Sequence, residues 1–391
     1  MRIGIDARYL SHGLIGGVHN YLAHLVPALL DTGRAHQFFL YVDDKRPFEL
    51  TDLPGHATLR TLPYRGPLSS ARFDLTLHRA MRRDAVDVMH FPANIGLGAR
   101  DIATVLTLHD AINVMPLRDI LAGHRKAPRT AAMMTYLHAM TKAAVRRADV
   151  LATGSQHARA AILTATRLDP DRVAVVPLAA PPRFGVLEDR PAFERVRARL
   201  QLPDRFILAD ALKNPAVVVA AHAGLPVDLR TQTPIVFFCR HDRPPTPVTD
   251  AVMRGVATLV VRPSDDELLA VYNLARAFVF PSLIEGFGIV ALEAMACGVP
   301  VVASDRGSIP EVCGDAALLA PADDVSAFAR HLEAALRDGP ERARLIAAGF
   351  EQARRFSWRR SALLMLDLYA QAVARRAARH PAPAAEVTRC A

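Results

Sequence analysis

The chain has 391 residues, of which 51% are apolar, enough for two or three domains of about 150 residues with their own cores. This composition excludes a disordered or fibrous chain. The formal net charge is +9, and because only four residues are lysines, arginine carries nearly all of the positive charge. The arginines are scattered and have no aromatic residues interleaved, so we expect solvated surface positions and no nucleic-acid partner; an anionic partner is the alternative.

Four cysteines, Cys239, Cys297, Cys313 and Cys390, share no short paired spacing, which argues against a disulfide framework and against a zinc site. The first residues, Met1–Arg8, become charged before any apolar run of signal-peptide length appears. No later stretch reaches about 18 uninterrupted apolar residues, the length that a membrane-spanning helix needs. We therefore expect a cytoplasmic protein with no segment that spans a membrane.

Short runs rich in β-branched and aromatic residues alternate with helical patterns in the first half of the chain. Between the first two runs, apolar residues recur with a period of about 3.6 from Leu22 to Leu30, which predicts a helix that Pro27 is expected to kink. This alternation is typical of parallel sheets covered by crossover helices. The predicted strands lie near Arg2–Asp6, Gln37–Val42, Thr58–Leu62, Val86–Phe91, Thr104–Leu108, Val150–Thr153 and Val173–Pro177.

The stretch between Leu178 and Arg205 is rich in proline and charge, and we interpret it as the boundary between two α/β units. Beyond it the alternation resumes, and Glu351–Ala378 is predicted to form one or two long helices before a disordered tail. In doubly wound sheets of this kind, ligands bind beyond the carboxyl ends of the strands. The strands predicted in this half lie near Arg205–Ala209, Pro234–Phe238, Thr258–Val261, Ala277–Phe280 and Val299–Ala303.

The segment 280–300 carries the most chemical information. It predicts a strand, then a loop with Glu285 and two glycines, and then a helix from about Gly288 to Cys297. Glycine lets a ligand approach the backbone closely, and the start of a helix offers unpaired N–H groups at the positive end of its dipole. The sequence therefore predicts an anion site suited to a diphosphate.

Two carboxylates flank this site. Glu293 lies about five residues into the predicted helix, roughly 7–8 Å from its start, which is near the distance from a nucleotide's diphosphate to its ribose hydroxyls. An unpaired charge in an otherwise apolar helix costs several kcal/mol, so Glu293 needs a partner. One interpretation is that Glu293 holds a ribose and Glu285 a sugar; the other is that Glu285 caps a helix and Glu293 pairs with an arginine.

These residues closely resemble a known motif. Glu285 and Glu293, separated by seven residues, match the E-x7-E signature of the retaining GT-B glycosyltransferases of family 4. The resemblance covers almost the whole chain in the expected order. It takes in Ile3–Arg8, Gly16–Tyr21, His109–Asp110, Asp265–Ala275 and Val301–Ala317.

The resemblance implies an α/β fold of the GT-B class, with two doubly wound Rossmann-like domains facing a central cleft. The implied N-terminal, acceptor-side domain spans residues 1–180, and a linker spans 181–204. A nucleotide-sugar-binding domain follows at 205–355, then a C-terminal helix at 356–378 that packs back on the N-terminal domain, and a disordered tail at 379–391.

The resemblance also implies roles for individual residues. Glu285 is implied to contact hydroxyls of the donor sugar, Glu293 to contact the donor ribose, and Lys213 to neutralise the diphosphate. His109 is implied to lie beside the reacting sugar. The implied backbone contacts to the diphosphate come from Gly16, Gly17, Gly286, Phe287, Gly288 and Ile289. Simpler interpretations are a tight turn at the Gly16–Gly17 pair, a helix entry at Lys213 and a turn histidine at His109.

Members of the family retain the anomeric configuration of the donor, by a front-side displacement in which the leaving diphosphate helps to deprotonate the acceptor. Such a site needs positive groups around the departing phosphate more than a strong base. No paired-aspartate metal motif stands out, so we expect no metal and no cofactor, with a helix dipole and a lysine in their place. The expected donor is GDP-mannose or a UDP-sugar. The expected acceptor is a bacterial surface polysaccharide or a lipid-linked oligosaccharide, with peripheral contact to the inner membrane.

Two departures from the family pattern bear on the phosphate site. Asp210 leads directly to Lys213, without the longer and often arginine-bearing loop of relatives, so Arg240 after the next strand is a candidate replacement. Ala179 stands where many relatives have glycine. Three interpretations follow: an active hexosyltransferase, a non-catalytic or weakened GT-B subunit that binds a nucleotide or a partner enzyme, and a different GT-B enzyme such as a sugar-nucleotide epimerase. The complete glutamate pair favours the first.

Overall fold

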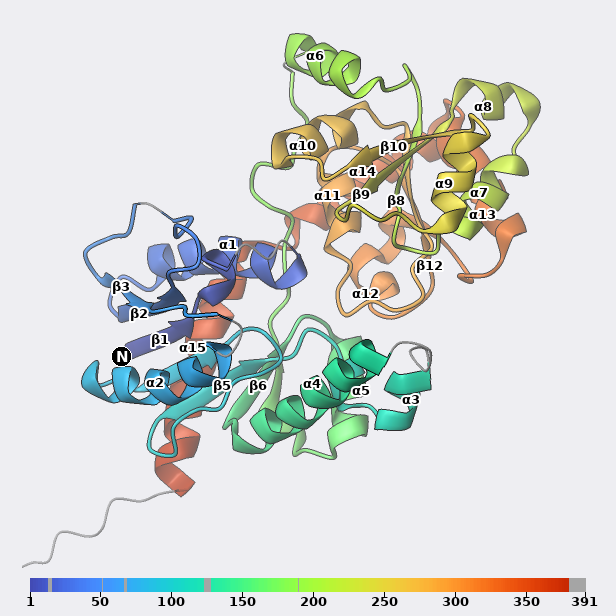
Figure 1. Cartoon of the computed structure of the whole chain (residues 1–391). Helices are drawn as coiled ribbons and strands as arrows, with labels where there is room; N and C mark the ends of the chain where they lie inside the picture. The colour runs from blue at the N-terminus through green and yellow to red at the C-terminus, as the bar shows by residue number, and fades with distance from the viewer. Residues whose placement is uncertain (13–15, 51, 67–68, 123–127, 189, 380–391) are drawn as a thin grey trace, which may run out of the picture. The chain divides into compact units, whose positions relative to one another are not determined.

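The computed structural model describes residues 1–12, 16–50, 52–66, 69–122, 128–188 and 190–379, and it divides into two compact units (Figure 1). The first unit comprises Met1–Thr153, Arg159–Val176 and the residues from Arg359 onward. The second comprises Gly154–Ala158 and Pro177–Trp358. Each unit is therefore assembled from segments that are distant in the sequence.

The first unit contains a seven-stranded sheet in the order β3-β2-β1-β4-β5-β6-β7, and all of its neighbouring strands pair in parallel. Its strands are β1 (Arg2–Asp6), β2 (Gln37–Asp43), β3 (Ala57–Leu62), β4 (Val88–Phe91), β5 (Ala103–Thr107), β6 (Val150–Thr153) and β7 (Val173–Val175). Its helices are α1 (Gly17–Thr32), α2 (Ser69–Arg83), α3 (Leu117–Ala122), α4 (Pro128–Arg147), most of α5 (Gln156–Thr166) and nearly all of α15 (Trp358–Arg379), with 3-10 turns at Arg8–Leu10, Ile112–Val114 and Pro170–Arg172.

The second unit contains a six-stranded parallel sheet in the order β10-β9-β8-β11-β12-β13. Its strands are β8 (Ile207–Asp210), β9 (Ile235–Cys239), β10 (Ala257–Val261), β11 (Ala277–Phe280), β12 (Val301–Ser304) and β13 (Ala317–Ala320). Its helices are α6 (Arg190–Leu200), α7 (Pro215–Ala223), α8 (Val227–Gln232), α9 (Thr246–Met253), α10 (Asp265–Leu274), α11 (Ile289–Ala296), α12 (Ile309–Cys313), α13 (Val325–Leu336) and α14 (Pro340–Arg354), with a 3-10 turn at Gly314–Ala316.

Both strand orders are doubly wound, since each chain segment builds outward from a central strand first in one direction and then in the other. The predicted pair of doubly wound α/β units is therefore confirmed. Strand β13 was not predicted, because its sequence Ala-Leu-Leu-Ala lacks the β-branched residues that favour strands. Helix α1 continues through Pro27. None of the helices in the described part of the chain is long and apolar enough to cross a membrane.

The segment 181–204, expected to be a linker, lies within the second unit. Phe184 and Leu202 join the same apolar cluster as Phe206, and α6 packs against α10. The apolar residues between the prolines therefore anchor this segment to a core. The helix expected at 356–378 is α15, which belongs to the first unit from Arg359 onward, and the expected tail lies outside the described residues apart from its first residue.

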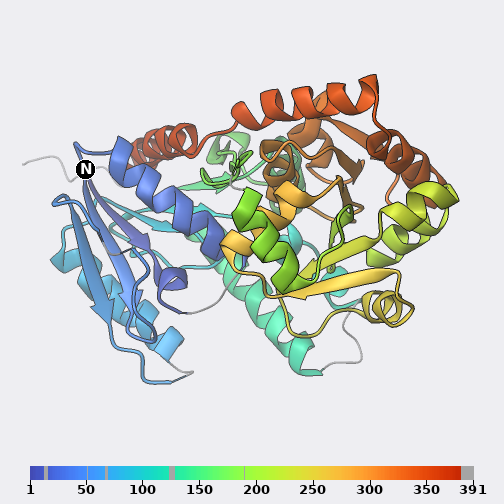
Figure 2. The ribbon, with the colours of Figure 1, turned by 90° about the horizontal axis from the view of Figure 1, so that it is seen from above.

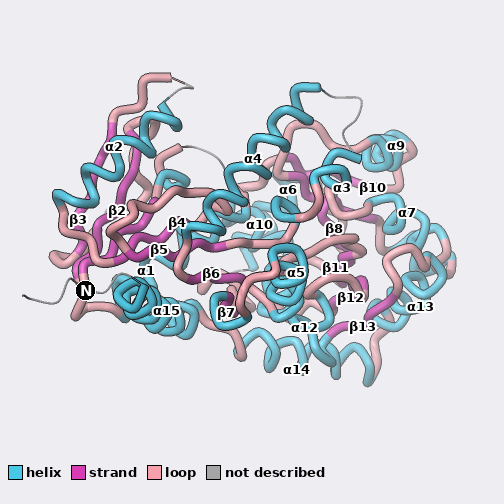
Figure 3. Tube along the Cα trace, turned by 90° about the horizontal axis from the view of Figure 1, so that it is seen from below, coloured by secondary structure: helices cyan, strands magenta, loops and turns pink. Residues whose placement is uncertain are grey.

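The four inner strands of the second sheet, β9, β8, β11 and β12, are buried on both faces. Leu208 of β8 packs into one cluster with Phe238, whereas its neighbours Ile207 and Ala209 pack into a second cluster with Phe237. Figure 3 shows the strands of each sheet side by side, with helices along them. Burial on both faces accounts for the continuous apolar runs in the sequence, and it makes the sheet a firm support for the residues that follow each strand.

A buried polar network ties α15 to the sheet of the first unit, where α15 lies beside α1 (Figures 2 and 3). The hydroxyl of Tyr369 hydrogen-bonds to Nδ1 of His90 at 2.9 Å, and Nε2 of His90 hydrogen-bonds to the hydroxyl of Thr107 at 2.8 Å. Burial lowers the pKa of His90 to about 3, and protonation of nearby His109 would act in the same direction. His90 is therefore neutral in the folded protein, with one ring nitrogen donating and the other accepting.

The free energy of unfolding should fall as the pH decreases below the ordinary histidine pKa of about 6.5. In that range His90 is protonated in the unfolded chain, whereas in the folded protein it stays neutral until about pH 3. This group alone should contribute a slope of about 1.4 kcal/mol per pH unit in that range. Urea denaturation followed by circular dichroism from pH 7.5 to pH 5 measures the slope. His90→Gln should reduce this slope by about 1.4 kcal/mol per pH unit, the contribution of one proton. An unchanged slope in this variant would contradict the assignment.

Candidate active site

The candidate site of the second unit is built where four parallel strands end. β8, β9, β11 and β12 are neighbours in one sheet, so the residues that follow them converge at a single edge. Lys213, after β8, lies 2.5 Å from an Oε atom of Glu285, which follows β11. The structure thus brings together two of the residues that the sequence singled out 72 positions apart.

The side chain of Glu285 has two polar partners, and both contact the same carboxylate oxygen, Oε1. Besides the Lys213 ammonium, it accepts a hydrogen bond from the hydroxyl of Ser282 at 2.8 Å, and only 13% of the side chain is exposed. Neither α11 nor α12 has a side-chain cap, so the interpretation of Glu285 as a helix cap is wrong. A carboxylate fixed by a lysine and a serine is oriented before any ligand arrives.

The backbone of the Glu285 loop is fixed by the segment after β12. Ser308 donates both its N–H and its hydroxyl to the Glu285 carbonyl, at 3.3 and 3.2 Å. Gly307 has φ +63°, and a Cβ there would lie 2.6 Å from that carbonyl oxygen. Only glycine permits this approach, because the backbone angle and the contact both exclude a side chain.

Helix α11 begins directly after the loop. Gly288 takes a left-handed conformation with φ +88°, and α11 starts at Ile289. Phe287 is buried and packs edge-on against Phe356, with ring centroids 5.6 Å apart, and the Gly286 carbonyl accepts a hydrogen bond from Ser155 at 2.7 Å. Ala291 donates its N–H to the Gly288 carbonyl at 3.0 Å, whereas the N–H groups before it at the helix start have no intrahelical acceptor, so they are available to an anion.

Glu293 lies in the middle of α11 with 1% exposure. It accepts a hydrogen bond from the Tyr272 hydroxyl at 3.2 Å, and within the described chain no arginine or lysine lies within ion-pairing distance. The alternative that Glu293 pairs with an arginine is therefore wrong. Burial raises the pKa of Glu293, while the more distant Arg240 charge and the Tyr272 hydrogen bond oppose that rise.

A tight turn replaces the longer loop after β8. The Asp210 carboxylate accepts the N–H of Leu212 at 2.8 Å, and the Asp210 carbonyl accepts the N–H of Lys213 at 3.2 Å. Asn214, in a left-handed conformation, then leads into α7. The turn is short, yet it delivers the ammonium group of Lys213 to Glu285.

Arg240 supplies a second positive group at this edge. It follows β9, whose Phe238 pairs with Asp210 of β8, and its guanidinium lies 5.9 Å from the centroid of the Phe238 ring. Its charge acts on both buried acids, opposing the rise that burial produces in the pKa of Asp210 and of Glu293. Among the described residues, Arg240 has no hydrogen bond and no ion pair, so its donors are available to a ligand.

The remaining predicted residues lie in the first unit. Gly16 precedes α1 and Gly17 begins it, and a Cβ at either position would meet nothing within 4 Å. His109 follows β5; its N–H donates to Asn94 at 2.9 Å and its Nε2 donates to the Pro92 carbonyl at 2.8 Å. Burial lowers the pKa of His109, so the ring is neutral and Nδ1 has a lone pair to accept a hydrogen bond.

Sequence reasoning missed several partners of the predicted residues. Tyr272, Ser282 and Ser308 carry no recognisable signal, because they act through contacts 21, 3 and 23 positions away along the chain. Arg240 was found only as a replacement for a missing charge. The described residues include no group of three histidine, cysteine, aspartate or glutamate side chains placed to hold a metal ion.

Two family descriptions match this sequence: Glycosyltransferase Family 4 over residues 15–184 and Glycosyl transferases group 1 over residues 255–352. O-antigen chain mannosyltransferase B of Escherichia coli is 30% identical over 295 residues, which cover 73% of this chain and 75% of that protein. The serotype-specific mannosyltransferase WbdA of Escherichia coli is 32% identical over 235 residues, which cover 56% of this chain and 28% of that longer protein.

Solved structures share the fold at low sequence identity. WaaG, a glycosyltransferase involved in lipopolysaccharide biosynthesis, matches with a TM-score of 0.71 and 16% identity over 94% of this chain and 99% of its own. Sucrose-phosphate synthase from Thermosynechococcus elongatus matches with a TM-score of 0.70 and 21% identity, over 96% of this chain and 99% of its own. HepE of Anabaena, in complex with UDP and glucose, matches with a TM-score of 0.67 and 14% identity, over 94% of this chain and 99% of its own. The predicted GT-B fold class is confirmed.

Glu293→Gln should stabilise the protein at neutral pH. Because burial raises the pKa of the folded Glu293 carboxyl, wild type loses stability as the pH rises above about 4.5, where the unfolded chain ionises more readily than the folded protein. Glutamine carries no such charge. The melting temperature of the variant should exceed that of wild type by a few degrees at pH 8, at about 2–4 °C per kcal/mol, and by less at pH 5. Thermal denaturation at both pH values measures this difference.

Glu333→Gln is the matched control, since Glu333 lies on the surface of the same unit in an exposed pair with Arg337. A gap between wild type and Glu293→Gln that does not widen with pH would show that Glu293 is not a costly buried acid.

Proposed function

Because the chain belongs to the family 4 glycosyltransferases, we propose that it moves a hexose, preferably mannose, from a nucleoside diphosphate sugar to a growing bacterial surface polysaccharide or a lipid-linked oligosaccharide. The observation that carries the proposal is the position of Glu285, oriented by Lys213 and Ser282 beside the start of α11. The mannosyltransferase relative that aligns over three quarters of its length supports the choice of sugar.

The donor diphosphate is proposed to bind the first-turn N–H groups of α11, with the backbone of Gly286–Ile289 around it. Lys213 and Arg240 flank this position from the ends of β8 and β9. Glu293, one to two turns into the helix, is placed to accept hydrogen bonds from ribose hydroxyls. A buried carboxylate with a raised pKa gains more from two hydroxyl donors than an exposed one, because water does not compete with them.

Binding of the donor is proposed to rearrange the Lys213–Glu285 ion pair. A diphosphate carries more negative charge than a carboxylate, so it competes for the Lys213 ammonium. Glu285 then exchanges that partner for hydroxyls of the donor sugar, while Ser282 keeps the carboxylate in place. The ion pair would thus hold Oε1 of Glu285 while the site is empty and make that oxygen available to the sugar when the donor binds.

Transfer is proposed to proceed with retention and without a bound metal. The departing diphosphate gains charge as the glycosidic bond breaks, and Lys213, Arg240 and the α11 dipole stabilise that charge more in the transition state than in the ground state. The leaving phosphate itself then takes up the proton of the acceptor hydroxyl. This chemistry needs fixed positive groups, which this edge of the second sheet supplies.

In the first unit, the Gly16–Gly17 backbone is proposed to contact the diphosphate, and neutral His109 is proposed to orient the reacting sugar. The Nε2 hydrogen bond to Pro92 fixes the tautomer of His109, so Nδ1 can accept a hydrogen bond from a sugar hydroxyl. An orienting hydrogen bond of this kind affects the rate through geometry, not through proton uptake.

We also propose peripheral contact with the inner membrane from its cytoplasmic face. The first half of α4 has no buried residue and presents exposed Met133 and Tyr136 together with Arg129. Further along the helix, Lys142 and Arg146 are exposed as well. An apolar and basic helix surface fits an anionic bilayer.

Glu285→Ala should abolish transfer and leave nucleotide binding largely intact, because the side chain contacts the sugar and not the diphosphate. The assay is release of GDP from GDP-mannose with an alkyl α-mannoside as acceptor, and thermal shift with GDP, UDP and ADP reports binding and base preference. Undiminished turnover in this variant would refute the role of Glu285. Wild-type binding of a nucleotide with no turnover of any donor would favour the non-catalytic interpretation.

Lys213→Ala and Arg240→Ala should each weaken binding of GDP by about 10- to 100-fold, the loss expected for a charge-assisted hydrogen bond, and should barely change binding of guanosine. Isothermal titration calorimetry with the two ligands measures the contrast. Arg243→Ala is the control, since Arg243 is an exposed arginine a few residues beyond the same strand. Equal losses for GDP and guanosine would exclude phosphate contacts.

A further inference from the structure

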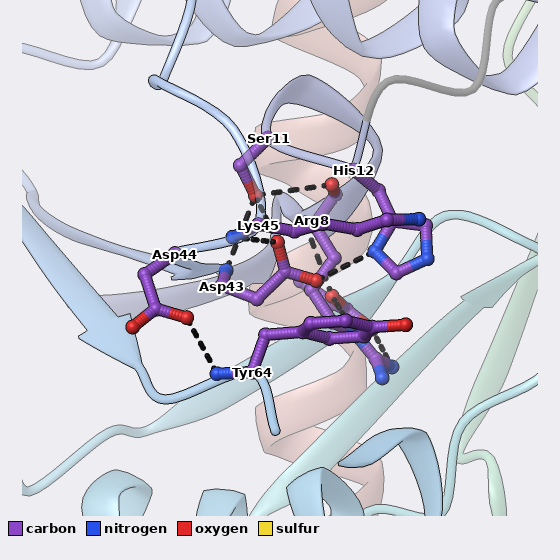
Figure 4. A network of polar contacts seen from close by, with 8 residues as sticks. Arg8, Ser11, His12, Asp43, Asp44, Lys45 and Tyr64 are labelled. Atoms are coloured by element: carbon purple, nitrogen blue, oxygen red, sulfur yellow. Dashed lines mark hydrogen bonds and ion pairs between the residues drawn. The ribbon is translucent and has the colours of Figure 1, made fainter. Parts of the chain in front are cut away.

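A second polar cluster lies at the carboxyl edge of the sheet in the first unit (Figure 4). We name it the Asp43 cluster; its members are Ser11, His12, Asp43, Lys45 and Tyr64. β1, β2 and β3 are adjacent parallel strands, so the segments that follow them meet. Ser11 and His12 come after β1, Asp43 and Lys45 lie at the end of β2, and Tyr64 follows β3.

Asp43 is the anchor of the cluster. Its side chain is 5% exposed, and it accepts hydrogen bonds from the Ser11 hydroxyl at 3.1 Å, the Lys45 N–H at 3.3 Å and Nδ1 of His12 at 2.6 Å. An ionised carboxylate only accepts, so Nδ1 of His12 must carry the proton. In the neutral ring Nε2 is then an acceptor, and among the described residues nothing hydrogen-bonds to it.

Tyr64 lies beside this imidazole, and the Lys45 ammonium lies beside Tyr64. The ring of Tyr64 meets the ring of His12 edge to face, with centroids 5.6 Å apart, and the Lys45 ammonium lies 5.3 Å from the centroid of the Tyr64 ring. The Tyr64 N–H donates to Asp44 at 2.5 Å, which fixes the backbone beneath the ring. In Figure 4 the Tyr64 hydroxyl and the outer edge of His12 point the same way, away from Asp43.

These three groups have complementary hydrogen-bonding abilities. Nε2 of His12 accepts, the Lys45 ammonium donates, and the Tyr64 hydroxyl does both. Each hydroxyl of a saccharide also donates and accepts, so neighbouring sugar hydroxyls can satisfy all three. An anionic ligand fits less well, because the carboxylates of Asp43 and Asp44 offset the charge of the Lys45 ammonium, and Arg8 is already paired with Asp6 at 2.6 Å.

We propose that the Asp43 cluster binds the saccharide acceptor, with Nε2 of His12 accepting a hydrogen bond from a sugar hydroxyl and the Tyr64 hydroxyl and Lys45 ammonium binding its neighbours. This assignment of the acceptor rests on the proposed glycosyl transfer, whereas saccharide binding by the cluster does not. Asp43 is a positioning residue, since it acts through His12.

Steady-state kinetics with octyl α-mannoside as acceptor and saturating GDP-mannose test the assignment. His12→Ala and Tyr64→Phe should each raise the acceptor KM about three- to ten-fold, the loss of one hydrogen bond, and leave the donor KM within about two-fold of wild type. Tyr64→Phe keeps the ring and its packing, so it separates recognition from folding. The control is His36→Gln, because His36 precedes β2 at the opposite edge of the same sheet.

A second measurement keeps the inference independent of turnover. Saturation-transfer NMR with methyl α-mannoside should show binding to wild type and to His36→Gln, and a weakened signal for His12→Ala and Tyr64→Phe. If the protein has no transferase activity, the proposed function fails, and this measurement still decides saccharide binding. An acceptor KM or NMR signal that is unchanged in both cluster variants, or no signal with wild type, overturns the inference.

Discussion

Every strand pair in both sheets is parallel, and this constraint underlies the rest of the structure. Parallel pairing puts all carboxyl ends of a sheet at one edge, so residues far apart in sequence become neighbours there. The contact between Lys213 and Glu285 in one unit and that between His12 and Asp43 in the other both depend on it. Apolar burial on both faces keeps the strands in register and leaves chemistry to the residues just beyond them.

The second unit keeps costly acids next to its candidate site. Asp210 and Glu293 are both buried, and burial raises the pKa of each. A hydrophobic residue at either position would stabilise the fold more than a poorly paired acid does. The tyrosine hydroxyl of Tyr272 and the charge of Arg240 offset part of that cost, which is the pattern expected where stability is given up for ligand binding.

The two carboxyl edges differ in their chemistry. The edge of the second sheet combines a helix start, Lys213 and Arg240, so it suits a diphosphate. The Asp43 cluster at the edge of the first sheet combines carboxylates with a lysine, a histidine and a tyrosine. The same architecture therefore presents a helix start with two cationic side chains in one unit and a hydroxyl-compatible set of side chains in the other, and the difference comes from a few residues after each strand.

Local sequence determined the described strands except β13, because periodicity and β-branched runs act over a few residues. The glycine-bounded motif around Glu285 and Glu293 located the start of α11. Local sequence did not determine the partners: Tyr272 rather than an arginine contacts Glu293, and Ser282 and Lys213 rather than a helix terminus contact Glu285. Nor did it show that the proline-rich segment 181–204 folds into the second unit or that Tyr369 reaches His90. Those outcomes depend on which strand ends and helices meet in space. Packing between residues far apart in the sequence decides this, and local sequence patterns carry no information about such contacts.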